Sequence, residues 1–341
     1  IHYSVVASRR GVSEHMQSQQ RMADEEYQRE ARTCALERFS AAHWVDQAEA
    51  MGARYITLVC KHHDGFCFWD SKTTDFNIMN TAFGRDLVRE VSDECHRRGI
   101  RFCVYCSQPD WHARSYAWLP GAWGDRQWSV PDEQPDHEAY LAYLRQQLAE
   151  LLSNYGDVGG VWFDASDWTE ARWRGREIYA MIKRLQPQAA VNERAGYGDY
   201  LSAEVQLDET IDDHQYQQEQ CLSVARYGWA YHKDSDWRST RELVDIVVRM
   251  IGCGSNLLLN IGPMGDGMVP EPATARLREL GRWVKTHAEA VYGTEPVRLA
   301  GLPDTMRAAR RGDDLFVFLR EWPASDRLAL PSLPARPARA E

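Results

Sequence analysis

The sequence lacks three features that would assign it to common classes of protein. No apolar run approaches the roughly 20 residues that a helix needs to cross a bilayer, so no membrane partner is expected. The formal net charge is −10, which argues against nucleic acid as a partner because phosphate binding needs a basic surface. No pair of CxxC motifs occurs, so a zinc site is not expected either.

The eight cysteines are scattered along the chain, several of them inside apolar runs, as expected for small buried hydrophobic side chains. Cys103 and Cys106 have CxxC spacing, but within a strand they point to opposite faces, which suits neither a metal nor a redox dithiol. The cysteine usage leans toward a reducing compartment and leaves the localisation open.

Both ends of the chain look like cut points. The sequence starts with Ile1 rather than Met, so we expect a preceding segment to be absent. It ends in a Pro/Ala/Arg-rich tail at 333–341, which we expect to be a frayed or truncated terminus.

The 341 residues alternate short apolar runs with longer amphipathic stretches. Short strands between helices of ten or more residues indicate parallel strands joined by crossover helices. A closed barrel is favoured over an open sheet, because no Gly-rich phosphate loop follows an early strand. Strands are expected at 54–60, 100–106, 160–163, 189–192 and 257–261, and helices at 41–51, 85–98, 136–155, 173–185, 240–251 and 272–292.

The predicted fold class is therefore α/β, with a (β/α)8-type barrel followed by a small β domain. We assign residues 1–296 to the barrel. Two strand-like segments, 306–310 and 314–319, flank a turn at Arg311-Gly312-Asp313. They indicate the start of a C-terminal β domain at 297–341, which we expect to be truncated.

Catalytic groups of such barrels collect at the C-terminal ends of the strands. His62, Trp111, Asp164 and Arg194 stand at or just after four of the expected strand ends. Aromatic and planar polar groups suit a sugar, and the chain has 13 Trp and 15 Tyr. Hydrolysis of a glycosidic bond usually needs two carboxyl groups. Asp164 and Glu219 are the expected pair, with Glu204 and Asp208 as reserve candidates for the second.

Several blocks of the sequence are similar to one known family. The block Lys61-His62-His63-Asp64-Gly65-Phe66-Cys67-Phe68-Trp69-Asp70-Ser71 resembles the signature of the α-L-fucosidases, glycoside hydrolase family 29. The resemblance covers nearly the whole chain in the same order, through Arg85-Asp86-Leu87-Val88, Asp110-Trp111-His112, Val161-Trp162-Phe163-Asp164, Val191-Asn192-Glu193-Arg194 and Asn256-Leu257-Leu258-Leu259-Asn260-Ile261-Gly262-Pro263.

The resemblance implies a role for each matching residue. Asp164 matches the family's nucleophile, and Glu219 is the best match to its acid/base residue. The reaction would be hydrolysis of terminal α-L-fucosyl residues from oligosaccharides or glycoconjugates with retention, without a metal or other cofactor. The residues that the resemblance and their positions assign to sugar binding are His2, Glu14, His62, His63, Tyr105, Trp111, Trp162 and Arg194.

Other interpretations stay open at this point. His15 stands where the family usually has an aromatic residue, and Cys106 where it often has a second Tyr. These departures allow a sugar-binding homologue with little or no activity, or a hydrolase for a related sugar such as an α-L-galactoside. Asp164 could instead cap the following helix, and Glu219 could be a surface residue in a polar loop.

Overall fold

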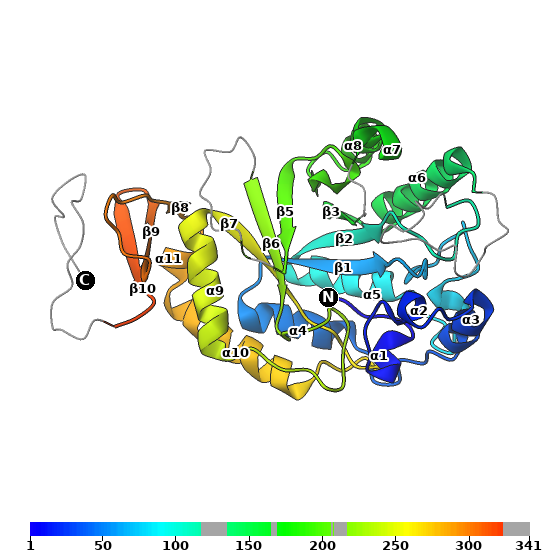
Figure 1. The fold of residues 1–341 in the computed structure, drawn as a ribbon, viewed down its shortest axis with the longest axis horizontal. Coiled ribbons are helices and arrows are strands. Elements are labelled where there is room, and N and C mark those ends of the chain that lie inside the picture. The colour runs from blue at the N-terminus through cyan, green and yellow to red at the C-terminus, as the bar shows by residue number, and fades with distance from the viewer. Residues whose placement is uncertain (117–134, 165–168, 206, 208–216, 323–341) are drawn as a thin grey trace.

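The computed structural model describes residues 1–116, 135–164, 169–205, 207 and 217–322. Within them, seven parallel strands form the wall of an α/β barrel (Figure 1). One sheet has the order β1-β2-β3-β4 and the other β5-β6-β7. The strands are β1 (Tyr55–Lys61), β2 (Arg101–Ser107), β3 (Val158–Asp164), β4 (Ala190–Val191), β5 (Tyr200–Glu204), β6 (Gln217–Ser223) and β7 (Ser255–Asn260).

Short contacts join the two sheets into one wall. Asn192, directly after β4, forms a parallel bridge with Tyr200 at the start of β5. On the other side, the first two residues of the chain lie between β1 and β7. The N–H of Val59 donates to the carbonyl of Ile1 at 3.0 Å, and the N–H of His2 donates to the carbonyl of Ile261 at 2.9 Å. The predicted α/β barrel is confirmed, with the N-terminal residues completing its wall.

Helices pack outside this wall, and the ends of the predicted helices carry the expected signals. Ser40, Asp86, Asp136 and Ser239 each accept a hydrogen bond from a backbone N–H in the first turn of the helix that follows. The helices after the first strands are α5 (Leu87–Arg98), α6 (His137–Asn154), α7 (Glu170–Trp173), α8 (Gly175–Leu185), α9 (Thr240–Cys253), α10 (Glu271–Thr286) and α11 (Ala288–Val291). They are preceded by α1 (Ala7–Arg10), α2 (Met16–Gln19), α3 (Asp24–Arg32) and α4 (Ala41–Met51). No helix in this described part of the chain combines the length and the apolar character needed to span a membrane.

The structure differs from the sequence prediction mainly at β5 and β6, which were not expected as strands. Their sequences, Tyr-Leu-Ser-Ala-Glu and Gln-Gln-Glu-Gln-Cys-Leu-Ser, contain no continuous apolar run. Both strands turn polar side chains such as Ser202 and Glu219 toward the inside of the barrel, where hydrogen bonds satisfy them. Hydrophobic periodicity therefore could not reveal them.

Side chains alternate along the strands between the barrel interior and the layer of helices. Val59, Tyr105, Trp162 and Cys221 form a small cluster inside the barrel. Cys106, next to Tyr105, belongs instead to the main core between strands and helices. All eight cysteines are buried, and none of them forms a disulfide.

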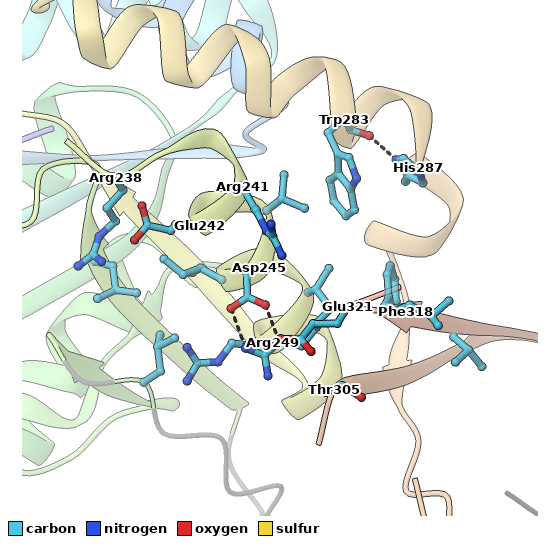
Figure 2. Close-up of a pocket in the computed structure, with 18 of the residues that line it drawn as sticks. Arg238, Arg241, Glu242, Asp245, Arg249, Trp283, His287, Thr305, Phe318 and Glu321 are labelled. Carbon is cyan, nitrogen blue, oxygen red and sulfur yellow. Dashed lines mark hydrogen bonds and ion pairs between the residues drawn. The ribbon is translucent and has the colours of Figure 1, made fainter. Parts of the chain in front are cut away.

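An antiparallel sheet follows the barrel, in the order β10-β9-β8. β8 (Glu295–Pro296), β9 (Met306–Arg311) and β10 (Asp314–Leu319) include both predicted strands, and the turn between them has Gly312 at φ 60°. Arg320 anchors the sheet to α9 by an ion pair with Asp245, beside a cavity of about 780 Å³ (Figure 2). The division of the chain at residue 297 stays a prediction.

One ion pair is fully buried near the end of β1. The Lys61 ammonium donates to Asp110 at 3.0 Å and to the Gln147 side chain at 2.8 Å, and neither charged side chain is exposed. Burial alone would lower the pKa of Lys61, but the Asp110 carboxylate raises it above its ordinary value. The same ammonium helps to keep the pKa of Asp110 low despite its burial. Both groups are therefore charged.

We predict that Lys61→Met lowers the free energy of unfolding by about 3–5 kcal/mol, because it leaves the Asp110 charge buried without its partner. The double variant Lys61→Met/Asp110→Asn recovers a large part of that loss, since Asn keeps the acceptor for the His112 and Ala113 N–H groups. Urea unfolding of the three proteins measures both effects. Equal stability of the single and double variants would contradict the charge argument.

Candidate active site

A cavity of about 340 Å³ opens at the C-terminal ends of the barrel strands. The ends of parallel barrel strands are where catalytic groups collect. Seven of the ten expected site residues line this cavity, namely His2, His62, His63, Tyr105, Trp162, Asp164 and Arg194. Glu204 and His15, outside the expected set, line it as well.

Asp164 is the last residue of β3, level with Ser107 at the end of β2. Its two carboxyl oxygens have separate donors. The Tyr105 hydroxyl donates to Oδ2 at 2.7 Å, and Nη1 of Arg194 donates to Oδ1 at 2.9 Å. Burial raises the pKa of Asp164, while the Arg194 charge and the two hydrogen bonds lower it. The carboxyl group reaches the cavity, because 14% of the side chain is exposed.

Arg194 connects Asp164 with a second carboxyl group. It lies in the short 3₁₀ helix η2 (Glu193–Ala195), and the same Nη1 atom also donates to Oε2 of Glu204 at 2.6 Å. The guanidinium carbon lies 4.4 Å from the centre of the Trp162 ring, and Nε donates to the Ser202 hydroxyl at 3.0 Å. A planar group held at both its face and its edge has little freedom to move.

Glu204 and Asp164 form a pair of neighbouring acids. Because both carboxylates contact one nitrogen atom, at 2.9 and 2.6 Å, their bonded oxygens lie at most about 5.5 Å apart, so the pair is no wider than the carboxyl groups of retaining glycosidases, which are roughly 5–5.5 Å apart. Burial raises the pKa of Glu204, and the nearby Asp164 charge raises it further, while Arg194 opposes both effects. Among the described residues, Asp164 accepts from two donor groups and Glu204 from one, so Asp164 is the better stabilised anion.

Glu219 lies deeper in the barrel, which departs from the expectation that pairs it with Asp164. Its carboxyl group accepts hydrogen bonds from the Tyr55 hydroxyl, at the start of β1, and from Trp162 Nε1 at 2.9 Å. On β6 the residue level with Glu204 is Cys221, and Cys221 lines the cavity where Glu219 does not. Two residues along a strand separate Glu219 from the catalytic end of the wall. The physical reason is the register of β5 and β6, which places Glu219 level with Ser202 rather than with Glu204.

Four histidines surround the other side of the cavity. His62 and His63 follow β1, and their ring centres lie 3.9 Å apart. His2 lies 4.6 Å from His62, and His15 stacks on His63 at 5.8 Å. Burial lowers the pKa of His2 to about 4 and the pKa of His62 and His63 well below the ordinary value. Neutral imidazole can both donate and accept a hydrogen bond, which suits sugar hydroxyls.

Two expected sugar-binding residues do not line the cavity in this structure. The Glu14 carboxylate accepts from the backbone N–H groups of Trp229 and Ala230 at 3.3–3.4 Å, and it lies 3.7 Å from Nδ1 of His15. The Trp111 ring is buried 5.7 Å from the His63 ring, and its backbone N–H donates to the His63 carbonyl. Both residues support the wall of the cavity rather than forming its surface.

Sequence reasoning ranked Glu204 only in reserve, and Asp208, the other reserve candidate, lies outside the described residues. The available signal was the pattern of Tyr200, Ser202 and Glu204, which places three polar groups on one face of a short strand. His15 was noted as a departure from the family pattern but not as a site residue. Cys106, the other noted departure, does not line the cavity.

Comparisons with known proteins identify the family of this chain. A family model described as alpha-L-fucosidase matches residues 1–289. The chain belongs to the α-L-fucosidase family. It is 28% identical to tissue alpha-L-fucosidase of Macaca fascicularis and to plasma alpha-L-fucosidase of Homo sapiens, in both cases over 86% of this chain and 64% of the relative. The chain thus spans just under two thirds of the length of these fucosidases.

Solved structures of family members share the fold. Alpha-L-fucosidase isoenzyme 1 from Paenibacillus thiaminolyticus superposes with a TM-score of 0.85 at 29% identity, covering 92% of this chain and 79% of that one. A Bacteroides thetaiotaomicron fucosidase, described as a trapped covalent intermediate with 2-fluoro-fucosyl fluoride, has a TM-score of 0.84 at 26% identity. It covers 96% of this chain and 81% of its own.

The position of Glu219 generates a prediction about stability. Burial raises the pKa of Glu219, so the folded protein holds this proton more tightly than the unfolded chain does. The wild-type protein therefore loses this stabilisation as the pH rises above the ordinary Glu range of about 4.3. Gln has the shape of the protonated acid and no proton to lose. We predict that Glu219→Gln becomes progressively more stable than the wild type as the pH rises above about 5, as measured by urea unfolding. Parallel pH profiles would contradict the burial of an ionisable Glu219.

Proposed function

We propose that this chain is a retaining exo-α-L-fucosidase, with Asp164 as the nucleophile and Glu204 as the acid/base residue. The observation that carries the proposal is the Arg194 nitrogen shared by Asp164 and Glu204 inside a cavity at the strand ends. Family membership supports the sugar, and the trapped covalent intermediate in the Bacteroides relative supports double displacement.

The first step forms a covalent fucosyl-enzyme. A carboxylate oxygen of Asp164 attacks the anomeric carbon, and the proton of Glu204 passes to the glycosidic oxygen, so that the aglycone leaves as an alcohol. In the second step Glu204 takes a proton from water, which attacks the same carbon and releases Asp164. Two displacements give net retention of configuration.

The other cavity residues contribute to these two reaction steps by binding the sugar and by stabilising the charge on Asp164. The Tyr105 hydroxyl and Arg194 stabilise Asp164 as an anion before attack, and the same groups stabilise it when it leaves. His2, His62 and His63 offer neutral ring nitrogens to the sugar hydroxyls, and Trp162 offers an apolar face. The presence of both carboxyl groups in one cavity favours a hydrolase over a homologue that only binds sugar.

We predict that Asp164→Gly lowers kcat on an aryl α-L-fucoside by at least about 10⁴-fold, because no nucleophile remains. Azide partly restores turnover by entering the space left by the side chain. The product of rescue is then a fucosyl azide of inverted configuration, since only one displacement occurs. Undiminished activity of the variant would remove Asp164 from the mechanism.

We predict that Glu204→Gln slows fucosides with poor leaving groups by about 10²–10⁴-fold and activated aryl fucosides much less, because only poor leaving groups need the proton. Loss of the carboxyl group also removes the high-pH decline of kcat/KM, where the wild-type acid ionises.

Glu219→Gln is the matched control, since it makes the same change two residues deeper in the barrel. We expect its dependence on the leaving group to stay that of the wild type. If instead Glu219→Gln is selective for poor leaving groups and Glu204→Gln is not, the acid/base role belongs to Glu219.

A further inference from the structure

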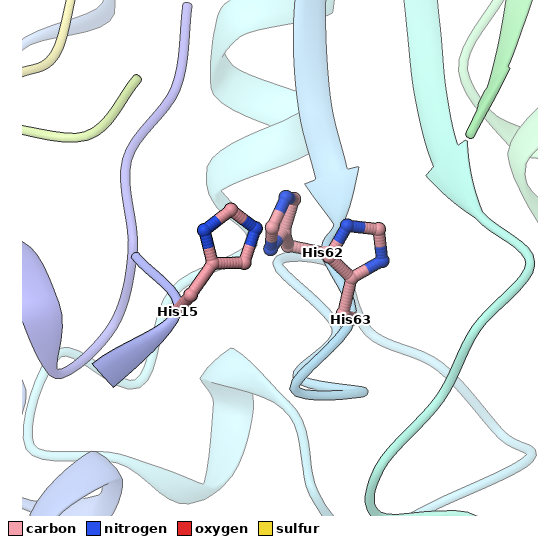
Figure 3. Close-up of side chains that lie close together, drawn as sticks. All are labelled: His15, His62 and His63. Atoms are coloured by element: carbon pink, nitrogen blue, oxygen red, sulfur yellow. The ribbon is translucent and has the colours of Figure 1, made fainter. Parts of the chain in front are cut away.

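We propose that His15, His62 and His63 form a binding site for a divalent transition-metal ion such as Zn²⁺, and that the bound ion blocks the active site. Figure 3 shows the three rings gathered beyond the C-terminal end of β1. The proposal that the ion inhibits rests on the proposed function, whereas the proposal that it binds does not.

The donor atoms are close enough to share an ion. One ring nitrogen from each of the three histidines lies within 4.8 Å of the others. Nitrogens bound to one tetrahedral Zn²⁺ at about 2.0–2.1 Å lie roughly 3.3 Å apart. The rings therefore need to close by about 1.5 Å at most, and His15, with 22% of its side chain exposed, has the freedom to do so.

The surrounding groups orient two of the rings as a metal site requires. Histidine ligands usually bind the metal through one nitrogen while the other contacts a carboxylate or another polar group. Nδ1 of His63 lies 2.6 Å from the Ser107 hydroxyl, which directs Nε2 toward the cavity. Nδ1 of His15 lies 3.7 Å from the Glu14 carboxylate, which favours Nε2 of His15 as the ligand.

A fourth ring supplies an independent observation. His2 is buried, and its Nε2 atom has no hydrogen-bond partner among the described residues. Its ring centre lies 4.6 Å from that of His62. A buried ring nitrogen without a partner is costly unless something binds it. This nitrogen of His2 lies at the edge of the three-histidine site, where it can accept a hydrogen bond from a water molecule bound to the ion.

The chemistry of the donors selects the class of metal. Neutral imidazole suits Zn²⁺, Cu²⁺, Ni²⁺ and Co²⁺, whereas Mg²⁺ and Ca²⁺ prefer oxygen ligands. An ion on His62 and His63 occupies the ring nitrogens that the proposed function gives to the sugar. Nε2 of His63 is also 3.6 Å from Oδ2 of Asp164, so the ion would compete with the sugar for the carboxylate of the proposed nucleophile.

The test titrates ZnCl₂ into the full chain by calorimetry at about pH 7.5, with MgCl₂ as the comparison ion. We expect one Zn²⁺ per chain, and at least about 100-fold weaker binding in His15→Phe, which keeps an aromatic ring but removes the ligand. His287→Gln is the matched control, because it removes an exposed histidine at the end of α10, beside a different cavity (Figure 2), and should bind zinc as the wild type does.

A second variant keeps all three rings. Glu14→Gln should weaken zinc binding by about 10–100-fold through loss of the carboxylate beside His15. Unchanged zinc affinity in both His15→Phe and Glu14→Gln, or equal affinity for Mg²⁺ and Zn²⁺, would overturn the site.

The same ions are then added to an aryl α-L-fucoside assay. We expect Zn²⁺ to inhibit the wild type reversibly, with recovery on chelation, and to inhibit His15→Phe far less. Inhibition of both proteins at the same zinc concentration would overturn the link to His15. A protein that binds zinc but cleaves no fucoside would refute the proposed function and leave the metal site standing.

Discussion

The active site depends on one buried cation between two acids. Two largely buried carboxyl groups at the C-terminal end of a barrel repel each other strongly, because little water is present to screen them. Arg194 resolves that conflict by donating from one nitrogen to both Asp164 and Glu204. A guanidinium suits this position better than an ammonium, since it stays charged when buried and can be held by its flat face.

The support of Arg194 extends into the barrel and gives Glu219 a physical role. The Arg194 guanidinium lies on the Trp162 ring, and the Trp162 indole donates to Glu219, which also accepts from Tyr55. Glu219 therefore fixes the ring on which the Arg194 guanidinium lies. A buried, hydrogen-bonded acid in this position explains why a strand of this polarity occurs in the interior of the barrel.

The sequence reveals the parts of the fold that are made from apolar runs and helix caps. β1, β2 and β3 are read directly from continuous apolar segments, and α4 and α5 from their caps and terminal glycines. β5 and β6 escape this reasoning, because they turn polar side chains such as Ser202, Glu204 and Glu219 toward the interior of the barrel. One of the strands that is hardest to predict, β5, thus carries the cavity residue Glu204.

The site itself divides in the same way. Asp164, His62 and His63 follow strands whose ends the sequence marks clearly, so their shared location could be predicted. The choice between Glu204 and Glu219 could not, because it depends on register within two unpredicted strands. A shift of two residues moves a carboxyl group from the cavity to the middle of the barrel.

His15 shows how one residue can alter what such a pocket binds. Burial keeps the neighbouring rings of His62 and His63 neutral, which lets them contact sugar hydroxyls without a fixed charge. An aromatic ring at position 15, as is usual in the α-L-fucosidase family, offers a face for the sugar but no lone pair. The imidazole of His15 also supplies a flat ring, which stacks on His63. It adds a third ring nitrogen close to those of His62 and His63. The property that prepares the rings for sugar, a neutral imidazole with a lone pair on one nitrogen, is also the property that a transition metal requires.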